Sequence, residues 1–162
     1  MEPRISVITL GVDDLERAAA FYEALGLERH SKFTDGVAFF QMGGLILALW
    51  PREELARDVG KEYRPRTAQA AEMVRTGEHG FTGEVAADFS GVALAYNTRA
   101  PEEVSEILAA AEKAGGRLLK GAQQAFWGGV QGYFEDTEGN LWEVAWNPDF
   151  PIDAQGRISL PT

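Results

Sequence analysis

Two stretches of eight residues, each ending in tryptophan, decide the fold class of this sequence. Residues 43–50 read GGLILALW, and residues 139–146 read GNLWEVAW. Each begins with a turn that contains glycine and continues as a short apolar run, which is typical of a β-strand. The segments before the two stretches also follow one common order. We therefore predict a duplicated unit in which each stretch forms the last strand.

The first unit spans residues 4–50 and has the predicted order β-α-β-β-β. Its helix has apolar side chains at helical spacing and ends at Gly26, and an Asp35-Gly36 turn favours a hairpin further on. The predicted strand, helix and three further strands lie at residues 5–12, 15–25, 28–33, 37–41 and 45–50.

The second unit spans residues 89–147 and repeats that order. Pro101 suits the first position of its helix, and Gly115-Gly116 end the helix. The predicted elements lie at residues 92–96, 101–114, 117–124, 130–135 and 141–146. Together the two units predict an α+β fold.

Two segments lie outside the repeat. Residues 51–88 are predicted to form a partly helical linker insertion, with helices at 52–59 and 67–75. The insertion contains several arginines, so it is either a solvated linker or a lid that places positive charge over an anionic ligand. The last segment, residues 148–162, is predicted to pack its apolar side chains on its own domain or across a homodimer.

The composition excludes several classes of chemistry. The chain has 162 residues, a formal net charge of −10, no cysteine and two histidines. The lack of cysteine excludes disulfides and thiolate metal sites, and two histidines cannot form a three-histidine site. Negative charge disfavours nucleic acid and anionic membranes as partners. Because no apolar run is long enough to span a bilayer and no secretory signal is visible, we expect a cytoplasmic protein.

Several short motifs occur together with the repeat. Phe21-Tyr22 lies late in the first helix, Leu25-Gly26 follows it, and the run Asp136-Thr137-Glu138-Gly139-Asn140 precedes Glu143. With two β-α-β-β-β units, these motifs resemble the glyoxalase / bleomycin-resistance / extradiol-dioxygenase group, the vicinal oxygen chelate superfamily. The resemblance covers both units. It implies curled mixed sheets around one shared cavity, a small-molecule ligand and a homodimer.

The resemblance also bears on metal binding. In metal-using members the ligands come from four symmetric positions, which the resemblance places at Val7, Leu47, Gly91 and Glu143. Of these, only Glu143 has a side chain that can bind a metal ion, and a mononuclear site needs about three protein ligands. We therefore predict no cofactor, and a divalent metal is disfavoured.

The candidate site is built around Glu143. Strand alternation puts Glu143 on one face of its strand, and Trp142 and Trp146 on the other. The resemblance implies that Glu143 faces the cavity and that these tryptophans pack beneath the helices. Glu143 is the predicted catalytic residue, as a general acid or base, or else a structural carboxylate bonded to Asn97, Tyr133 or water. The predicted ligand-binding residues are Thr9, Leu47, Asn97, Trp127, Gln131, Tyr133 and Glu143.

These expectations lead to three classes of function. The first is binding of a small, largely apolar organic molecule in the curled-sheet cavity, without metal. The second is an enzyme of the same superfamily, a lyase, isomerase or dioxygenase that uses Glu143 as base or as metal ligand. The third is a structural interaction module, which the expected homodimer allows.

Overall fold

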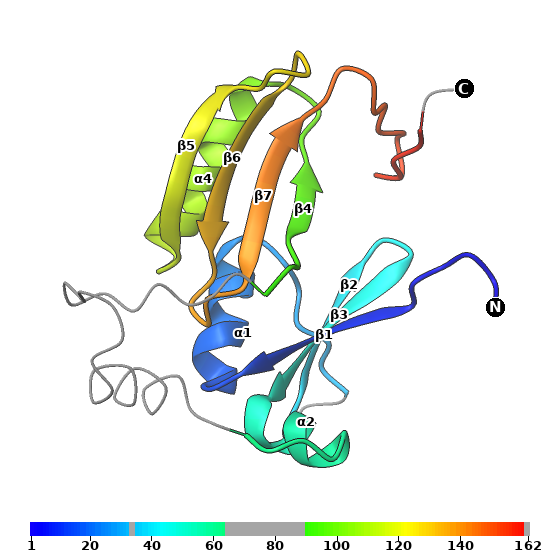
Figure 1. The fold of residues 1–162 in the computed structure, drawn as a ribbon, viewed down its shortest axis with the longest axis vertical. Coiled ribbons are helices and arrows are strands. Elements are labelled where there is room, and N and C mark those ends of the chain that lie inside the picture. Colours follow the sequence, from blue (N-terminus) through cyan, green and yellow to red (C-terminus); the bar gives the residue numbers. More distant parts are fainter. Residues whose placement is uncertain (33–34, 64–89, 161–162) are drawn as a thin grey trace.

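A computed structural model describes residues 1–32, 35–63 and 90–160 (Figure 1). The elements in that part of the chain fall into two successive groups, each of which begins with a strand, continues with a helix and then has further strands. They are β1 (Val7–Val12), α1 (Leu15–Ala24), β2 (Ala38–Met42), β3 (Leu45–Pro51), α2 (Arg52–Asp58), β4 (Leu94–Asn97), α4 (Glu102–Lys113), β5 (Arg117–Gln124), β6 (Val130–Glu135) and β7 (Leu141–Trp146).

The first group forms a three-stranded mixed sheet with the order β1-β3-β2. β1 runs parallel to β3, and β2 pairs with β3 in the antiparallel direction. A two-residue turn, Gly43-Gly44, joins Met42 to Leu45 across the hairpin. Gly43 has a φ of +59°, a conformation in which glycine avoids the cost that other residues meet.

The second group forms a four-stranded mixed sheet with the order β4-β7-β6-β5, again with its first and last strands parallel. Helix α4 covers one face of this sheet and contacts β5, β6 and β7 (Figure 1). Its inner side carries the buried residues Val104, Leu108 and Ala111. Gly132 of β6 allows this close approach, because a Cβ there would lie 2.4 Å from Leu108 Cδ1.

The predicted α+β fold is confirmed, and one predicted strand is wrong. β6 and β7 have the predicted bounds, and α2 occupies most of the helix expected at residues 52–59. Residues 28–32, the described part of the strand expected at 28–33, do not form a strand. They make an isolated bridge, Arg29 to Phe40, beside a backbone hydrogen bond from His30 to Phe39, and pairing of this extent is too short for a strand. The helix expected at residues 67–75 lies outside the described residues.

The two sheets remain separate and unclosed, and a shared aromatic core joins the two groups. Phe21 and Tyr22 of α1 pack against Phe134 and Trp142 of the second sheet, with ring centroids 6.1 and 6.0 Å apart respectively. Tyr22 Oη donates a hydrogen bond of 2.6 Å to the buried carboxylate of Asp136 and accepts one of 3.2 Å from Trp142 Nε1. Burial and the Asp136 charge raise the pKa of Tyr22, so this phenol stays protonated.

Glu138, two residues further along the same turn, makes a second connection. Its carboxylate is buried and accepts a 2.6 Å hydrogen bond from the backbone N–H of Asp13, at the start of α1. Arg17 Nη2 forms an ion pair with the other carboxylate oxygen, also at 2.6 Å. The acidic turn that carried the family resemblance therefore joins the second group of elements to α1.

The segment after β7 is hydrogen-bonded to Arg99, and the expected packing of its apolar side chains stays a prediction. Arg99 donates hydrogen bonds to the carbonyl oxygens of Ile152 and Asp153, at 3.0 and 2.8 Å. Ile152 and Ile158 form an isolated bridge around the turn at Asp153. Among the described helices, none is long and apolar enough to cross a membrane.

Candidate functional site

Strand β7 has two faces with different surroundings. Trp142 and Val144 are buried toward α4, as predicted for Trp142. Glu143 lies on the opposite face, where it is half-buried and pairs with Ala95 of β4 on one side and Tyr133 of β6 on the other. Since α4 covers only the first face, we call the second the open face of the sheet (Figure 1).

A phenol and a carboxylate form the polar centre of the open face. Tyr133 Oη donates a 2.9 Å hydrogen bond to Glu143 Oε1. Burial and the neighbouring Glu143 raise the pKa of Tyr133, so its hydroxyl remains a donor at neutral pH. Glu143 Oε2 accepts no hydrogen bond from the described residues, and thus one oxygen of an oriented carboxylate is available to a ligand.

Lys120 is a member of this group that sequence reasoning missed. It pairs with Tyr133 across β5 and β6, and its ammonium lies 5.7 Å from the centroid of the Tyr133 ring. At that distance the cation is attracted to the ring face. A register shift in β5 on either side of Lys120 sets its position, and an irregularity of this kind leaves no signal in the hydrophobic pattern.

Asn97 and Gln131 lie one step further along the open face. Both pair with Ala145, from β4 and β6 respectively. They therefore stand on either side of β7, two residues away from Glu143 along the strand. The structure brings these predicted site residues together with Tyr133 and Glu143 on one face, although their part in ligand binding stays a prediction.

Trp127 lies in the loop between β5 and β6 and is half-buried. Its ring packs over Gly129, where a Cβ would come within 1.7 Å of Cζ3. The adjacent Phe126 is fully exposed, at 100%. Packing on Gly129 accounts for the position of Trp127, and its predicted role at a ligand entrance stays a prediction.

The expectation that Leu47 shares a face with Thr9 is wrong. The β1–β3 register pairs Thr9 with Ala48, whereas Leu47 pairs with Ile8. Leu47 is 2% exposed and belongs to the hydrophobic core, while Thr9 is exposed on the other face. The physical reason is the two-residue period of side-chain alternation in a strand, since a shift of one position moves a residue to the opposite face.

The register identifies different counterparts for Glu143 than the sequence comparison did. Glu143 pairs with Ala95, and Ala48 pairs with Thr9 in the equivalent parallel ladder. Alanine offers no metal ligand, and threonine offers only a neutral hydroxyl. Among the described residues, no three His, Cys, Asp or Glu side chains are grouped so as to hold a metal ion. The donor set around Glu143 therefore does not fit the metal centre used by other proteins of this fold.

The order of elements, the parallel first and last strands of each sheet and the Glu143 face define a duplicated α+β protein of the vicinal oxygen chelate type. The family model described as the Glyoxalase/Bleomycin resistance protein/Dioxygenase superfamily matches residues 4–144, and the chain belongs to that superfamily.

Solved structures of similar proteins agree with this assignment. A glyoxalase-related enzyme from Fulvimarina pelagi is 34% identical, with 99% of each chain covered and a TM-score of 0.77. The protein SA1046 from S. aureus is 18% identical, with 91% of this chain and 95% of that chain covered and a TM-score of 0.68. A lactoylglutathione lyase from Agrobacterium tumefaciens is 23% identical, with 90% and 94% covered and a TM-score of 0.58. Because their sequence identities are only 18% and 23%, the last two structures show a shared fold and nothing more about this chain. A search of curated proteins found no match.

Proposed function

We propose that the protein binds a small, largely apolar organic molecule on the open face around Glu143, without using a metal ion. The observation that carries the proposal is the Tyr133–Glu143 hydrogen bond, which orients a carboxylate and leaves its second oxygen available. An acceptor held in this way selects a ligand with an O–H or N–H group. The exposed Ala95, which pairs with Glu143, would contact the apolar part of that ligand.

The polar groups of the open face offer a ligand hydrogen-bonding partners at two places along β7. Asn97 and Gln131 can each donate and accept, but they lie beside Ala145, beyond direct reach of the Tyr133–Glu143 pair. A ligand that contacts all of them would place its donor at Glu143 and a second polar atom near Ala145. Glu143, Asn97 and Gln131 would thus supply the few placed polar groups that a small-molecule site usually contains.

Matched phenols and their methyl ethers test this proposal. We expect a phenol to bind at least ten-fold more tightly than its methyl ether, measured by isothermal titration calorimetry, because only the phenol can donate to Glu143. Glu143→Leu should remove that difference. Glu112→Leu, an exposed glutamate on α4, is the matched control and should preserve it. Equal affinity of phenol and ether for the unmodified protein would contradict the proposal.

A second candidate function is catalysis, because a phenol and a carboxylate within hydrogen-bond distance can act as donor and base on one substrate. In a lyase or isomerase of this kind, Glu143 would accept a proton from the bound substrate. Glu143→Gln would then leave affinity nearly unchanged while turnover falls by roughly 10²–10⁴. A binding protein would show the same affinity and no turnover in either form.

Assembly is a further part of the proposal. We propose a homodimer, supported by exposed apolar side chains in the described part of the chain, with Phe126 at 100%, Leu160 at 75% and Val92 at 61%. Light scattering coupled to size-exclusion chromatography measures the mass directly, and a monomer at micromolar concentration would contradict it. The cytoplasmic location expected from the sequence stays a prediction.

A further inference from the structure

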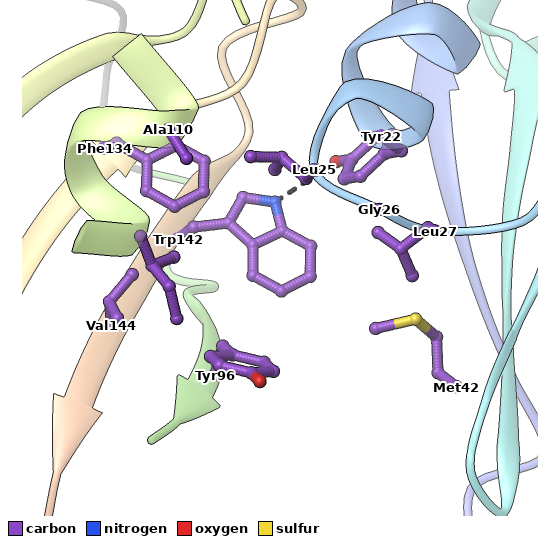
Figure 2. A pocket seen from close by; sticks show the side chains of 11 residues that line it. Tyr22, Leu25, Gly26, Leu27, Met42, Tyr96, Ala110, Phe134, Trp142 and Val144 are labelled. Carbon is purple, nitrogen blue, oxygen red and sulfur yellow. Dashed lines mark hydrogen bonds between the residues drawn. The ribbon is translucent and has the colours of Figure 1, made fainter. Parts of the chain in front are cut away.

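A cavity lies on the other side of the second sheet from the open face, where β7 faces the helices. It has a volume of about 380 Å³ and opens between the end of α1 and the second sheet. Figure 2 shows Leu27 and Met42 on one side of this cavity, Trp142 and Tyr96 on the opposite side, and Leu25 above Trp142. Its size falls within the range of small-molecule pockets, which begins at about 300 Å³. We call it the intermodule pocket.

The polar groups in the wall of the intermodule pocket are already paired. The Trp142 indole N–H donates to Tyr22 Oη, and Tyr22 in turn donates to Asp136 (Figure 2). The remaining hydroxyl belongs to Tyr96, whose side chain is 48% exposed and can therefore reach water. Away from Tyr96, a charged or strongly polar guest would lose its hydration without gaining a partner from the wall.

Aromatic rings form much of the wall. Phe134 and Trp142 are stacked, with an interplanar angle of 2° and centroids 6.2 Å apart. Tyr22 lies 6.0 Å from Trp142, tilted by 58°. Rings in such tilted and offset arrangements attract a further ring, and the thioether of Met42 adds a favourable contact with its edge.

We propose that the intermodule pocket is a separate binding site for small, uncharged aromatic molecules. It does not depend on the function proposed for the open face, because Trp142 and Glu143 are adjacent in β7 and point to opposite sides of the sheet. One protein would then hold two ligands of different character. The open face selects a hydrogen-bond donor, and the intermodule pocket selects an apolar ring.

Toluene is the probe for this proposal, with the indole N–H signal of Trp142 as the reporter. The chain has four tryptophans, so their side-chain signals can be assigned in a ¹⁵N-labelled sample by single substitution. We expect toluene to shift the Trp142 signal saturably and to leave that of Trp127 unchanged. Shifts that grow linearly at all tryptophans would overturn the proposal, because they indicate unspecific partition.

Two alanines of α4 provide a matched pair of variants. Ala110 lines the intermodule pocket and Ala109 does not, while both are exposed helical residues. Ala110→Phe should fill the pocket and weaken toluene binding at least ten-fold, and Ala109→Phe should not alter it. Ile107→Trp, at a second lining position, repeats the test if Ala110→Phe disturbs the circular dichroism spectrum. Unchanged affinity in a folded filling variant would overturn the proposal.

One further variant separates this site from the open face. Glu143→Leu should leave toluene affinity unchanged while removing the preference for phenols over their ethers. Loss of toluene binding in Glu143→Leu would show that the two sites are one and would overturn the proposal. Failure of the phenol test alone leaves the toluene result intact.

Discussion

The hairpins β2–β3 and β6–β7 hold equivalent places in the two sheets, yet their turns have different structural roles. The first turn is Gly43-Gly44, where an added Cβ would meet no atom within 4 Å. The second turn carries Asp136 and Glu138, which are both buried and both bonded to α1 or its first residues. One turn only reverses the chain, whereas the other also fixes the second sheet against the first group of elements.

The last strands of the two hairpins differ in the same way. Ala48 of β3 and Glu143 of β7 each lie beside the parallel first strand of the sheet, on the face opposite the buried core residues of their strand. On this face β3 carries Ile46, Ala48 and Trp50, whereas β7 carries the carboxylate of Glu143. The polar groups of both the turn and the open face are therefore concentrated in the second sheet.

The largest effect that would test this comparison is expected from Asp136→Ala. The Asp136 carboxylate accepts hydrogen bonds from Tyr22 Oη, the backbone N–H groups of Glu138 and Asn140, and Asn140 Nδ2. Removing a buried acceptor of this kind leaves several donors unpaired, so we expect a loss of about 3–5 kcal/mol in the free energy of unfolding, measured by urea denaturation.

Asp149→Ala is the control for that loss. Asp149 is an exposed aspartate after β7, and its removal should change stability by less than about 0.5 kcal/mol. If Asp136→Ala cost as little as Asp149→Ala, the acidic turn would not join the two groups of elements.

A smaller effect is expected from the second acid of the turn. Glu138→Gln keeps the shape of the side chain but weakens its charge-assisted bonds, and we expect a loss of about 1–2 kcal/mol. A double-mutant cycle with Arg17→Met isolates the ion pair. Because Arg17 is 54% exposed, the coupling should be about 1 kcal/mol or less.

The exposed pair Arg57–Glu53 in α2 is the matched control for that cycle. Its two side chains are 69% and 65% exposed, so the coupling should be about 0.3 kcal/mol. Coupling in the Arg17–Glu138 pair no larger than this would mean that the ion pair with Arg17 adds little to the position of Glu138.

Alanine substitutions at the two residues of the glycine turn should reduce stability by different amounts. Gly43 has a positive φ, so Gly43→Ala is expected to cost about 1 kcal/mol, whereas Gly44→Ala should cost less than about 0.5 kcal/mol. Thermal unfolding of the two variants under one set of conditions measures the contrast. Equal costs would indicate that the turn does not set the register between Met42 and Leu45.

The helices and strands of this fold could be predicted from the sequence, because the spacing of apolar residues and the positions of turn residues specify them locally. β6 and β7 have their predicted bounds for that reason. The strand expected at residues 28–33 failed because strand pairing needs a partner across the sheet, and only Arg29 has one among the described residues of that segment.

The faces of the strands were harder to predict than the strands themselves. Aligning the two stretches on Trp50 and Trp146 equated Leu47 with Glu143. The ladders show instead that Leu47 pairs with Ile8 in the core, so the alignment equates residues that lie on opposite faces of their sheets. Trp146 packs against the core, while Trp50 lies on the face of Ala48 and its Nε1 donates to Glu54. A shared residue type does not fix the side to which a strand residue points.

The acidic turn had a signal that sequence reasoning used only for family resemblance. Buried carboxylates are uncommon and require partners, but Tyr22 and Arg17, which bind Asp136 and Glu138 respectively, lie more than a hundred residues away in the chain. The intermodule pocket was missed for the same reason, because its wall combines residues from both groups of elements. Neither could be found from spacing along one segment.

A small effect on stability is also expected from Glu143→Leu. This variant tests whether folding requires the carboxylate on the open face of the second sheet. Glu143 is half-buried, and its partner Tyr133 is half-buried as well, so the phenol can turn to water when the carboxylate is removed. We expect the free energy of unfolding to change by less than about 0.5 kcal/mol, measured by urea denaturation. Tyr133→Phe should be equally mild, and the double variant should be additive within about 0.5 kcal/mol. A loss above about 2 kcal/mol in Glu143→Leu would show that the sheet depends on this carboxylate as it does on Asp136. A near-zero change would show that folding does not require Glu143, as expected if this carboxylate serves ligand binding.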